Sequence, residues 1–247
     1  MNIIAVIPAR YGSTRFPGKP LALLGDVPII ERVYKNAAQC VEQVWVATDD
    51  ERIAEAVSSF GGRVVMTAET HRSGTDRVAE AAAEIGLNCD FDVVINVQGD
   101  EPFVQNEQLV ALTECFADPE TQIATLIKPI TVPADIFNAN RPKVVIDRYG
   151  YALMFSRSPL PYVRGKAQHE WHEAHQFFCH LGMYAYRADV LQEITRLTPS
   201  SLETAESLEQ LRWLENGYRI KTAITTFDSI GIDTPEDLEA ANKLLTR

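Results

Sequence analysis

The sequence lacks long apolar runs and closely paired cysteines. The longest apolar runs, Ile3–Ile7 and Tyr151–Phe155, contain five residues each. A membrane-spanning helix needs about 20 such residues, so no membrane segment is expected. The opening MNIIAVIPAR has neither the charged start nor the long apolar centre of a signal peptide. The four cysteines are far apart and form no C-x-x-C pair. This spacing favours a reduced, cytoplasmic chain over a disulfide or zinc framework.

Positive charge is also scarce. The chain has 23 Lys and Arg against 34 Asp and Glu, which gives a net charge of −11. We therefore expect it to bind neither nucleic acid nor an anionic membrane. Two segments depart from this average, because residues 1–25 carry three basic and no acidic residues, and residues 141–166 carry six basic residues and one acidic residue. These basic segments suggest a site for a small anion; the alternative is chance clustering.

The first half of the 247 residues alternates apolar strands with amphipathic helices. Strands are predicted at residues 2–7, 43–47, 63–66 and 93–97. Helices are predicted from Pro28, over 53–60, around 78–85 and over 105–116. This order predicts an α/β fold with a parallel sheet covered on both faces. Such sheets bind ligands at the carboxyl ends of their strands, here in loops 8–20, 48–50 and 98–104.

The second half is less regular. Strands are predicted at residues 123–130, 143–147, 152–156, 179–187 and 220–227. One helix is predicted over 203–216, and a final helix begins at the capping-box pattern of residues 234–237. Residues 157–178, rich in His, Pro and Arg, are predicted to be an exposed excursion. No linker divides the chain, so we expect a single domain over residues 1–247.

The segment PARYGSTRFPGKP, residues 8–20, follows the first predicted strand. Glycines and prolines shape it into a loop that carries Arg10, Arg15 and Lys19. Backbone N–H groups together with Arg and Lys are what a triphosphate requires. The spacing is neither that of a Walker A loop nor that of a G-x-G-x-x-G loop. The alternative is a surface turn with incidental charges.

Three further segments carry candidate chemistry. In NVQGDEP, Asp100 comes just after a buried strand, where a carboxylate beside phosphates suits Mg²⁺. In GIDTP, Asp233 is either a second such ligand or the cap of the following helix. The segment HRSGTDR, residues 71–77, precedes a helix whose N-terminus can approach a ligand, although Ser73 and Thr75 fit simple helix caps equally well.

Taken together, the segments resemble one family. They read, in order, IPARYGSTRFPGKPL, TDD, HRSGTDR, NVQGDEPF, FSRSPLPY, HLGMYAYR, ESLEQLRWLENGYRI and GIDTPEDLE. This series is similar to the 3-deoxy-manno-octulosonate cytidylyltransferases (CMP-Kdo synthetases) and extends over nearly the whole chain. The resemblance implies a Rossmann-like fold of the nucleotide-diphospho-sugar transferase type, with a smaller mixed-sheet excursion in the second half.

The resemblance also implies an activity. CTP and Kdo would give CMP-Kdo and pyrophosphate with Mg²⁺ as cofactor, for lipopolysaccharide biosynthesis in the cytoplasm. Residues 1–120 would form the nucleotide-binding half. Residues 121–230 would bind the acid sugar and form a homodimer.

Roles for individual residues follow from the same resemblance. The catalytic residues would be Lys19, Arg15, Asp100 and Asp233, of which the two aspartates hold the metal. The nucleotide would contact Pro8, Ala9, Arg10, Ser13, Arg15, Lys19, Arg72, Ser73, Gly74, Arg77, Gln98 and Asp100. The sugar would contact Gln98, Arg157, Arg164, His180, Tyr184, Glu209 and Gln210. On local pattern alone, Tyr184 fits an ordinary core position, and Glu209 and Gln210 fit a solvated helix face.

Several alternatives stay open. The substrate could be a related acid sugar, such as 8-amino-Kdo or a sialic acid. A different nucleotidyltransferase acting on a methylerythritol phosphate is opposed by the segments FSRSPLPY and HLGMYAYR, and a catalytically silent nucleotide-binding module is opposed by the presence of Lys19, Asp100 and Asp233. His169, His172 and His175 have a spacing that could ligate zinc, but a solvated segment is the preferred interpretation.

Overall fold

The computed structural model describes residues 1–245 and divides into two compact units. The first unit contains Met1–Leu109 together with the C-terminal segment that begins at Ser229. The second unit is Val110–Asp228, so it is inserted between two parts of the first. Among residues 1–245, every helix is too short or too polar to span a lipid bilayer.

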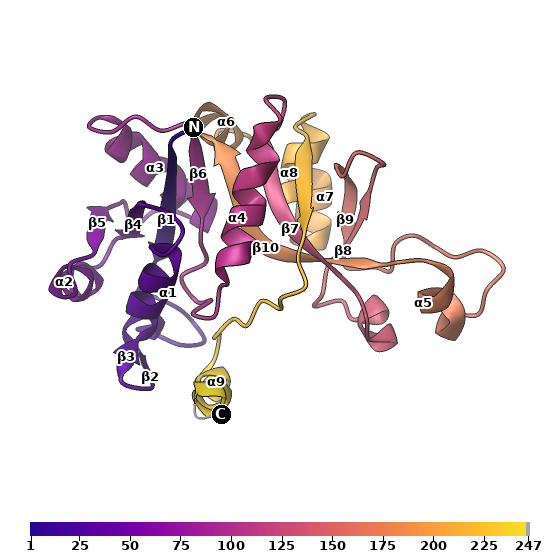
Figure 1. Ribbon diagram of the computed structural model, residues 1–247, viewed down its shortest axis with the longest axis horizontal. Coiled ribbons are helices and arrows are strands. Elements are labelled where there is room, and N and C mark those ends of the chain that lie inside the picture. Colours follow the sequence, from indigo (N-terminus) through magenta and orange to yellow (C-terminus); the bar gives the residue numbers. More distant parts are fainter. Residues whose placement is uncertain (246–247) are drawn as a thin grey trace. The chain divides into compact units, whose positions relative to one another are not determined.

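The first unit is built on four parallel strands. They are β1 (Ile3–Ala9), β4 (Gln43–Thr48), β5 (Arg63–Met66) and β6 (Val93–Asn96), which pair in the order β6-β1-β4-β5 (Figure 1). All four residues of β6 are buried, as are the four consecutive residues from Ile4 to Ile7. Because successive strand residues point to opposite faces, both faces of this sheet are covered. The predicted parallel α/β sheet is confirmed.

Amphipathic helices connect these strands. They are α1 (Ile29–Ala37), α2 (Glu51–Ser59) and α3 (Gly74–Gly86). The predicted apolar positions Val78, Ala82 and Ile85 are buried along α3, as the 3.6-residue period requires. A short 3₁₀ turn, η1 (Lys19–Leu21), and the small hairpin of β2 (Leu23–Leu24) and β3 (Val27–Pro28) lead from β1 into α1.

The chain leaves the first unit through α4 (Asn106–Glu114) and returns to it before the last helix, α9 (Pro235–Leu245). The predicted capping box opens α9. Thr234 Oγ1 accepts the N–H of Asp237 at 3.2 Å, and the Asp237 carboxylate accepts the N–H of Thr234 at 2.9 Å. The expectation for this helix start is confirmed.

The second unit has a mixed sheet. Its strands are β7 (Ile123–Pro129), β8 (Lys143–Ile146), β9 (Ala152–Ser156), β10 (Phe178–Arg187) and β11 (Ile220–Ile224). The pair β11–β7 is parallel, whereas β7–β10, β10–β8 and β8–β9 are antiparallel. The smaller elements are η2 (Cys115–Ala117), η3 (Pro133–Phe137), η4 (Gln168–Glu170), α5 (Trp171–Ala174), α6 (Ala188–Ile194), α7 (Ser201–Glu206) and α8 (Gln210–Glu215).

Two expectations for the second unit are wrong. The single helix predicted over 203–216 is two helices, α7 and α8, because Ser207 adopts the left-handed conformation with φ 51°. The excursion over 157–178 is not wholly exposed, because Trp171 and Phe177 are buried with Ile136 in a small core. The helix α6 follows β10 directly and was not predicted.

Candidate functional site

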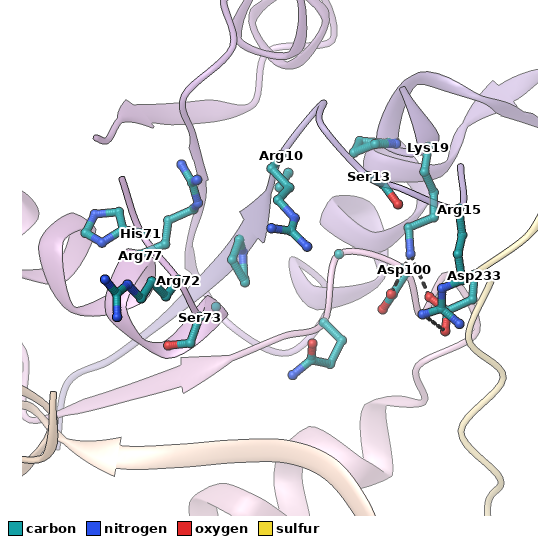
Figure 2. A pocket seen from close by; sticks show the side chains of 16 residues that line it. Arg10, Ser13, Arg15, Lys19, His71, Arg72, Ser73, Arg77, Asp100 and Asp233 are labelled. Atoms are coloured by element: carbon teal, nitrogen blue, oxygen red, sulfur yellow. Dashed lines mark hydrogen bonds and ion pairs between the residues drawn. The ribbon is translucent and has the colours of Figure 1, made fainter. Parts of the chain in front are cut away.

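A pocket of about 310 Å³ lies in the first unit, where β1 and β6 end and α3 begins. Its lining residues are Pro8, Ala9, Arg10, Ser13, Arg15, Lys19, Pro20, His71, Arg72, Ser73, Gly74, Arg77, Gln98, Gly99, Asp100 and Asp233 (Figure 2). The structure thus brings together every residue that the sequence assigned to the nucleotide or the metal. Pro20, His71 and Gly99 line the pocket without having been assigned a role. The predicted roles themselves stay predictions.

Lys19 joins the two aspartates that are far apart in sequence. Its Nζ lies 2.7 Å from Asp100 Oδ2 and 3.1 Å from Asp233 Oδ1. The Lys19 side chain is only 13% exposed. Arg15 adds a second cation, with its Nη2 2.9 Å from Asp233 Oδ2. Figure 2 shows this cluster at one end of the pocket, with Arg10 between it and the segment His71–Arg77.

Local structure directs the Asp233 carboxylate toward this cluster. The helix cap that Asp233 could have supplied is made by Thr234 instead. The backbone N–H of Asp233 donates to Asp237 at 3.0 Å, and these backbone bonds hold the pKa of Asp237 below its usual value. The N–H of Ile232 donates to the carbonyl of Asp100 at 2.9 Å, which ties the two aspartate segments together.

Glu101, the residue that follows Asp100, has a structural role. Burial raises the pKa of its carboxyl to about 7, although a hydrogen bond with Ser229 opposes this shift. Asp100 lines the pocket, whereas Glu101 is not among its described lining residues.

Three side chains around the start of α3 make local contacts that hold it in place. Ser73 caps the helix, since its Oγ accepts the N–H of Asp76 at 3.1 Å. Arg77 is 4% exposed and donates to Asp49 Oδ2 and to Thr67 Oγ1, each at 2.6 Å. His71 Nε2 contacts the carboxylate of Glu80. Ser73 therefore combines the cap with a place in the pocket wall, and the Arg77 guanidinium braces that wall.

Two glycines bring backbone segments close to Pro8. A Cβ on Gly99 would lie 2.6 Å from the Pro8 carbonyl oxygen, closer than real Cβ atoms approach. A Cβ on Gly74 would lie 3.5 Å from Pro8 Cγ, an ordinary contact. The loop after β6 thus requires glycine at position 99 to pack on β1. The signal in the sequence was a glycine two residues after the predicted buried strand 93–97.

The second unit holds most of the predicted sugar residues. His180 Nε2 lies 3.0 Å from Thr125 Oγ1, and its ring packs against Phe155 and Tyr184 with centroids 5.0 and 5.3 Å away. Burial lowers the pKa of His180 to about 3, so its ring is neutral at physiological pH. Burial, with Tyr186 and Glu209 nearby, raises the pKa of Tyr184.

Gln210, at the start of α8, is 4% exposed. Its buried Nε2 has no hydrogen-bond partner among the described residues. A buried amide without a partner is costly, and a polar ligand can satisfy it. The solvated helix face proposed as the local alternative is therefore wrong for Gln210.

The two predicted arginines of the second unit differ. Arg157 donates from Nε to the Glu206 carbonyl at 2.6 Å, from Nη1 to Ala139 at 3.0 Å and from Nη2 to Ser207 at 3.3 Å. The bonds to Glu206 and Ser207 engage the end of α7. Arg164 is exposed. A guanidinium has five N–H donors, so Arg157 keeps donors for a ligand.

The donor set of the pocket fits Mg²⁺ better than a transition metal. No group of three or more His, Cys, Asp or Glu side chains is arranged to hold a metal within residues 1–245. His169, His172 and His175 are exposed. Mg²⁺ is commonly held by one or two carboxylates, with waters and substrate phosphates completing its shell. Asp100 and Asp233, which share one ammonium group, match that requirement.

Known proteins identify the family. A cytidylyltransferase family profile matches residues 4–221. The 3-deoxy-manno-octulosonate cytidylyltransferase of Parabacteroides distasonis is 57% identical over 98% of this chain and 97% of its own length. That of Bacteroides thetaiotaomicron is 56% identical over 99% of this chain and 98% of its own length.

Solved structures agree with this result. A CMP:2-keto-3-deoxy-manno-octonic acid synthetase, complexed with CTP, has a TM-score of 0.92 and 42% identity, covering 100% of this chain and 99% of its own. A putative glucose-1-phosphate thymidylyltransferase from Bacillus anthracis, covering 98% of this chain and 94% of its own, shares only the fold, with 16% identity and a TM-score of 0.66. The chain therefore belongs to the cytidylyltransferase family and, within it, to the 3-deoxy-manno-octulosonate cytidylyltransferases.

Proposed function

We propose that the protein transfers CMP from CTP to 3-deoxy-manno-octulosonate (Kdo) and releases pyrophosphate. One observation carries the proposal. Lys19, Arg15, Asp100 and Asp233 form a single ion-paired cluster in a pocket that all the predicted nucleotide residues line. The relative that is 42% identical over the whole chain is a CMP-Kdo synthetase in complex with CTP.

The pocket is suited to displacement at the α-phosphorus of CTP. A sugar hydroxyl attacks this phosphorus, and negative charge grows on the departing pyrophosphate. Catalysis of such a transfer depends on positioning and charge neutralisation more than on covalent chemistry. The ammonium of Lys19 has three N–H donors, two of which face carboxylates, so the third is available to a phosphate oxygen. Arg10 and Arg15 add two guanidinium groups.

We also propose Mg²⁺ as the cofactor, held by Asp100 and Asp233. When bound, Mg²⁺ would neutralise triphosphate charge and lower the pKa of a coordinated hydroxyl. In this structure Lys19 balances the two carboxylates, which keeps their negative charges close together. The chain thus prepares the two oxygen donors before any cation arrives.

For the sugar, we propose the polar positions of the second unit. His180 presents a neutral imidazole, Tyr184 a protonated hydroxyl and Gln210 a buried amide. Neutral hydrogen-bonding groups suit a polyhydroxylated ligand. Kdo also carries a carboxylate, for which Arg157 and Arg164 supply guanidinium groups.

We further propose a cytoplasmic homodimer. Large hydrophobic side chains of the second unit are exposed, with Tyr162 73%, Leu153 63% and Val132 53% accessible to solvent. Burying them against a second copy is favourable. All four cysteines carry free thiols, which fits a reducing compartment. Sedimentation analysis of the purified protein would give the oligomeric state, and a monomer would refute the dimer.

The test of the proposed function is pyrophosphate release with CTP and Mg²⁺. The panel contains Kdo, 8-amino-Kdo, a sialic acid and a blank without sugar. We expect release with Kdo and not with the blank. Release with another acid sugar alone would contradict the Kdo assignment, and release with none of them would contradict the activity.

A further inference from the structure

The loop of residues 8–20 closes around Tyr11. The carbonyl oxygen of Tyr11 accepts the N–H of Ser13 at 3.0 Å and the N–H of Gly18 at 2.9 Å. These two bonds bring the ends of the segment 11–18 together. The segment carries Ser13 and Arg15 and leads directly into Lys19, so its conformation places three pocket side chains.

The ring of Tyr11 also contacts the far end of the segment 11–18, at Gly18. Gly18 has φ +72°, and a Cβ at this position would lie 3.1 Å from three atoms of the Tyr11 side chain. The ring therefore covers the backbone immediately before Lys19. Both the carbonyl and the ring of Tyr11 hold this backbone.

Arg52, in the first turn of α2, covers the ring of Tyr11. The guanidinium carbon lies 3.3 Å from the ring centroid, at cation–π distance. Asp50 fixes the guanidinium in two places, with Oδ1 2.9 Å from Nε and Oδ2 2.6 Å from Nη2. These bonds lower the pKa of Asp50. Asp50, Arg52 and Tyr11 thus form a stack that connects α2 to the loop.

We propose that Arg52 and Tyr11 are positioning residues for the triphosphate of CTP. Neither belongs to the described residues that line the pocket, so both act through the loop. A loop that is ordered before the ligand arrives loses less conformational entropy on binding. The inference rests on the proposed function, because that function names CTP as the ligand.

Substitution of Arg52 tests the stack, with a matched control in the same unit. Arg63 also lies over an aromatic ring, that of Trp45, at 5.5 Å and away from the pocket. We expect Arg52→Ala to weaken CTP binding and raise KM for CTP by roughly 2- to 5-fold, the size of one exposed cation–π contact. KM for Kdo should not change, and Arg63→Ala should change neither constant.

Substitution of Tyr11 separates its ring from its hydroxyl. We expect Tyr11→Ala to weaken CTP binding at least as much as Arg52→Ala, and Tyr11→Phe to restore it, because phenylalanine keeps the face on which Arg52 stacks. Calorimetric titration with CTP and Mg²⁺ gives the dissociation constants, and thermal unfolding verifies that each variant is folded.

Three results would overturn the inference. Equal CTP affinity in Arg52→Ala and Arg63→Ala would show that the stack does not position the loop. Binding by Tyr11→Phe as weak as that by Tyr11→Ala would assign the effect to the hydroxyl. Absence of CTP binding by the unaltered protein would refute the proposed function, and this inference with it.

Discussion

Lys19 shows how one side chain can hold two carboxylates for a metal cation and also face an anionic phosphate. Its ammonium holds Asp100 and Asp233 together at 2.7 and 3.1 Å. The sequence pointed to all three residues, because each follows the end of a strand or precedes a helix. Their contact could not be predicted, since 81 residues separate Lys19 from Asp100 and 214 separate it from Asp233.

Removing the Asp100 charge should stop catalysis without unfolding the protein. We expect Asp100→Asn to lower turnover by roughly 100-fold or more, the usual cost of losing one charge-stabilising group. The side chain is 32% exposed, so the fold should tolerate the amide. Pyrophosphate release and circular dichroism measure the two properties. Asp90→Asn, an exposed residue of the same unit, is the control, and full activity in Asp100→Asn would refute the metal assignment.

His180 should make stability depend on pH. Its pKa is about 3 in the folded protein and about 6.5 when the chain unfolds, because burial disfavours the charged ring. Between these values the unfolded chain binds more protons, so the free energy of unfolding falls as pH falls from about 6.5 toward 3. Above about pH 6.5 the ring is neutral in both the folded and the unfolded chain, so the free energy of unfolding no longer changes with pH through this group.

Urea unfolding at several pH values measures this dependence. One proton corresponds to a slope of at most about 1.4 kcal/mol per pH unit. We expect His180→Gln to flatten the curve in this window. An unchanged slope in that variant would show that another group titrates there.

Among the elements, strands were more predictable than helix ends. The predicted segments at 63–66 and 152–156 match β5 and β9 residue for residue. Buried strands have continuous apolar sequences with sharp polar ends, which makes their limits visible. Part of the candidate site was predictable for the same reason, because the motifs at residues 8–20 and 96–102 follow such strands. Its other two motifs precede helices, and the roles of individual residues came from the family resemblance.

The misread elements depend on contacts between distant residues. Arg157 donates to the carbonyls of Glu206 and Ser207, and these bonds satisfy the end of α7 where an uninterrupted helix was expected. Trp171 stands in a polar segment, yet it packs on Phe177 with ring centroids 6.2 Å apart. The local periodicity of the sequence does not show that Arg157 contacts α7 or that Trp171 packs on Phe177.

The loop after β6 should not accept a side chain at position 99. Gly99→Ala forces its Cβ against the Pro8 carbonyl oxygen, and we expect a loss of about 1–3 kcal/mol in the free energy of unfolding. Gly74→Ala meets Pro8 at an ordinary 3.5 Å and should cost less than about 0.5 kcal/mol. Urea unfolding of both variants makes the comparison. Equal stability of the two variants would show that the backbone at position 99 shifts to accommodate the added Cβ.

We expect the small core around α5 to stabilise the segment that contains it. Trp171 is 3% exposed and contacts Phe137, Tyr162 and Phe177. Truncating a buried tryptophan typically costs about 3–5 kcal/mol, and we expect Trp171→Ala to lose an amount in this range. Leu87→Ala, at a side chain of the first unit that is 74% exposed, is the control. A loss no larger than that of the control would show that this cluster does not stabilise the unit.

At the scale of the whole molecule, the second unit is an insertion into the first. Asp100 and Asp233 lie on opposite sides of this insertion in sequence and belong to the same unit. The sequence prediction of halves at 1–120 and 121–230 stays a prediction about function. It did not foresee that the chain returns to its first unit from Ser229 onward.

Nucleotide binding should therefore protect three segments at once, two before the insertion and one after it. With CTP at 100 times its dissociation constant, linkage stabilises the bound protein by about 2.7 kcal/mol. We expect slower amide hydrogen exchange in the loops 8–20 and 97–101 and in residues 229–234, because all three segments carry or adjoin pocket residues. Protection of the first two segments alone would contradict the place of Asp233 in the nucleotide site.

The position of Asp233 also has a consequence for synthesis on the ribosome. Domains fold from the N-terminus as the chain emerges, at about 5–20 residues per second. The strands of the first unit and the loop with Lys19 are made early, but the second aspartate arrives only after the whole insertion has been translated. A nascent chain that ends anywhere before position 233 therefore lacks one of the two carboxylates. The pocket is completed late in translation, after every residue of the second unit is already present.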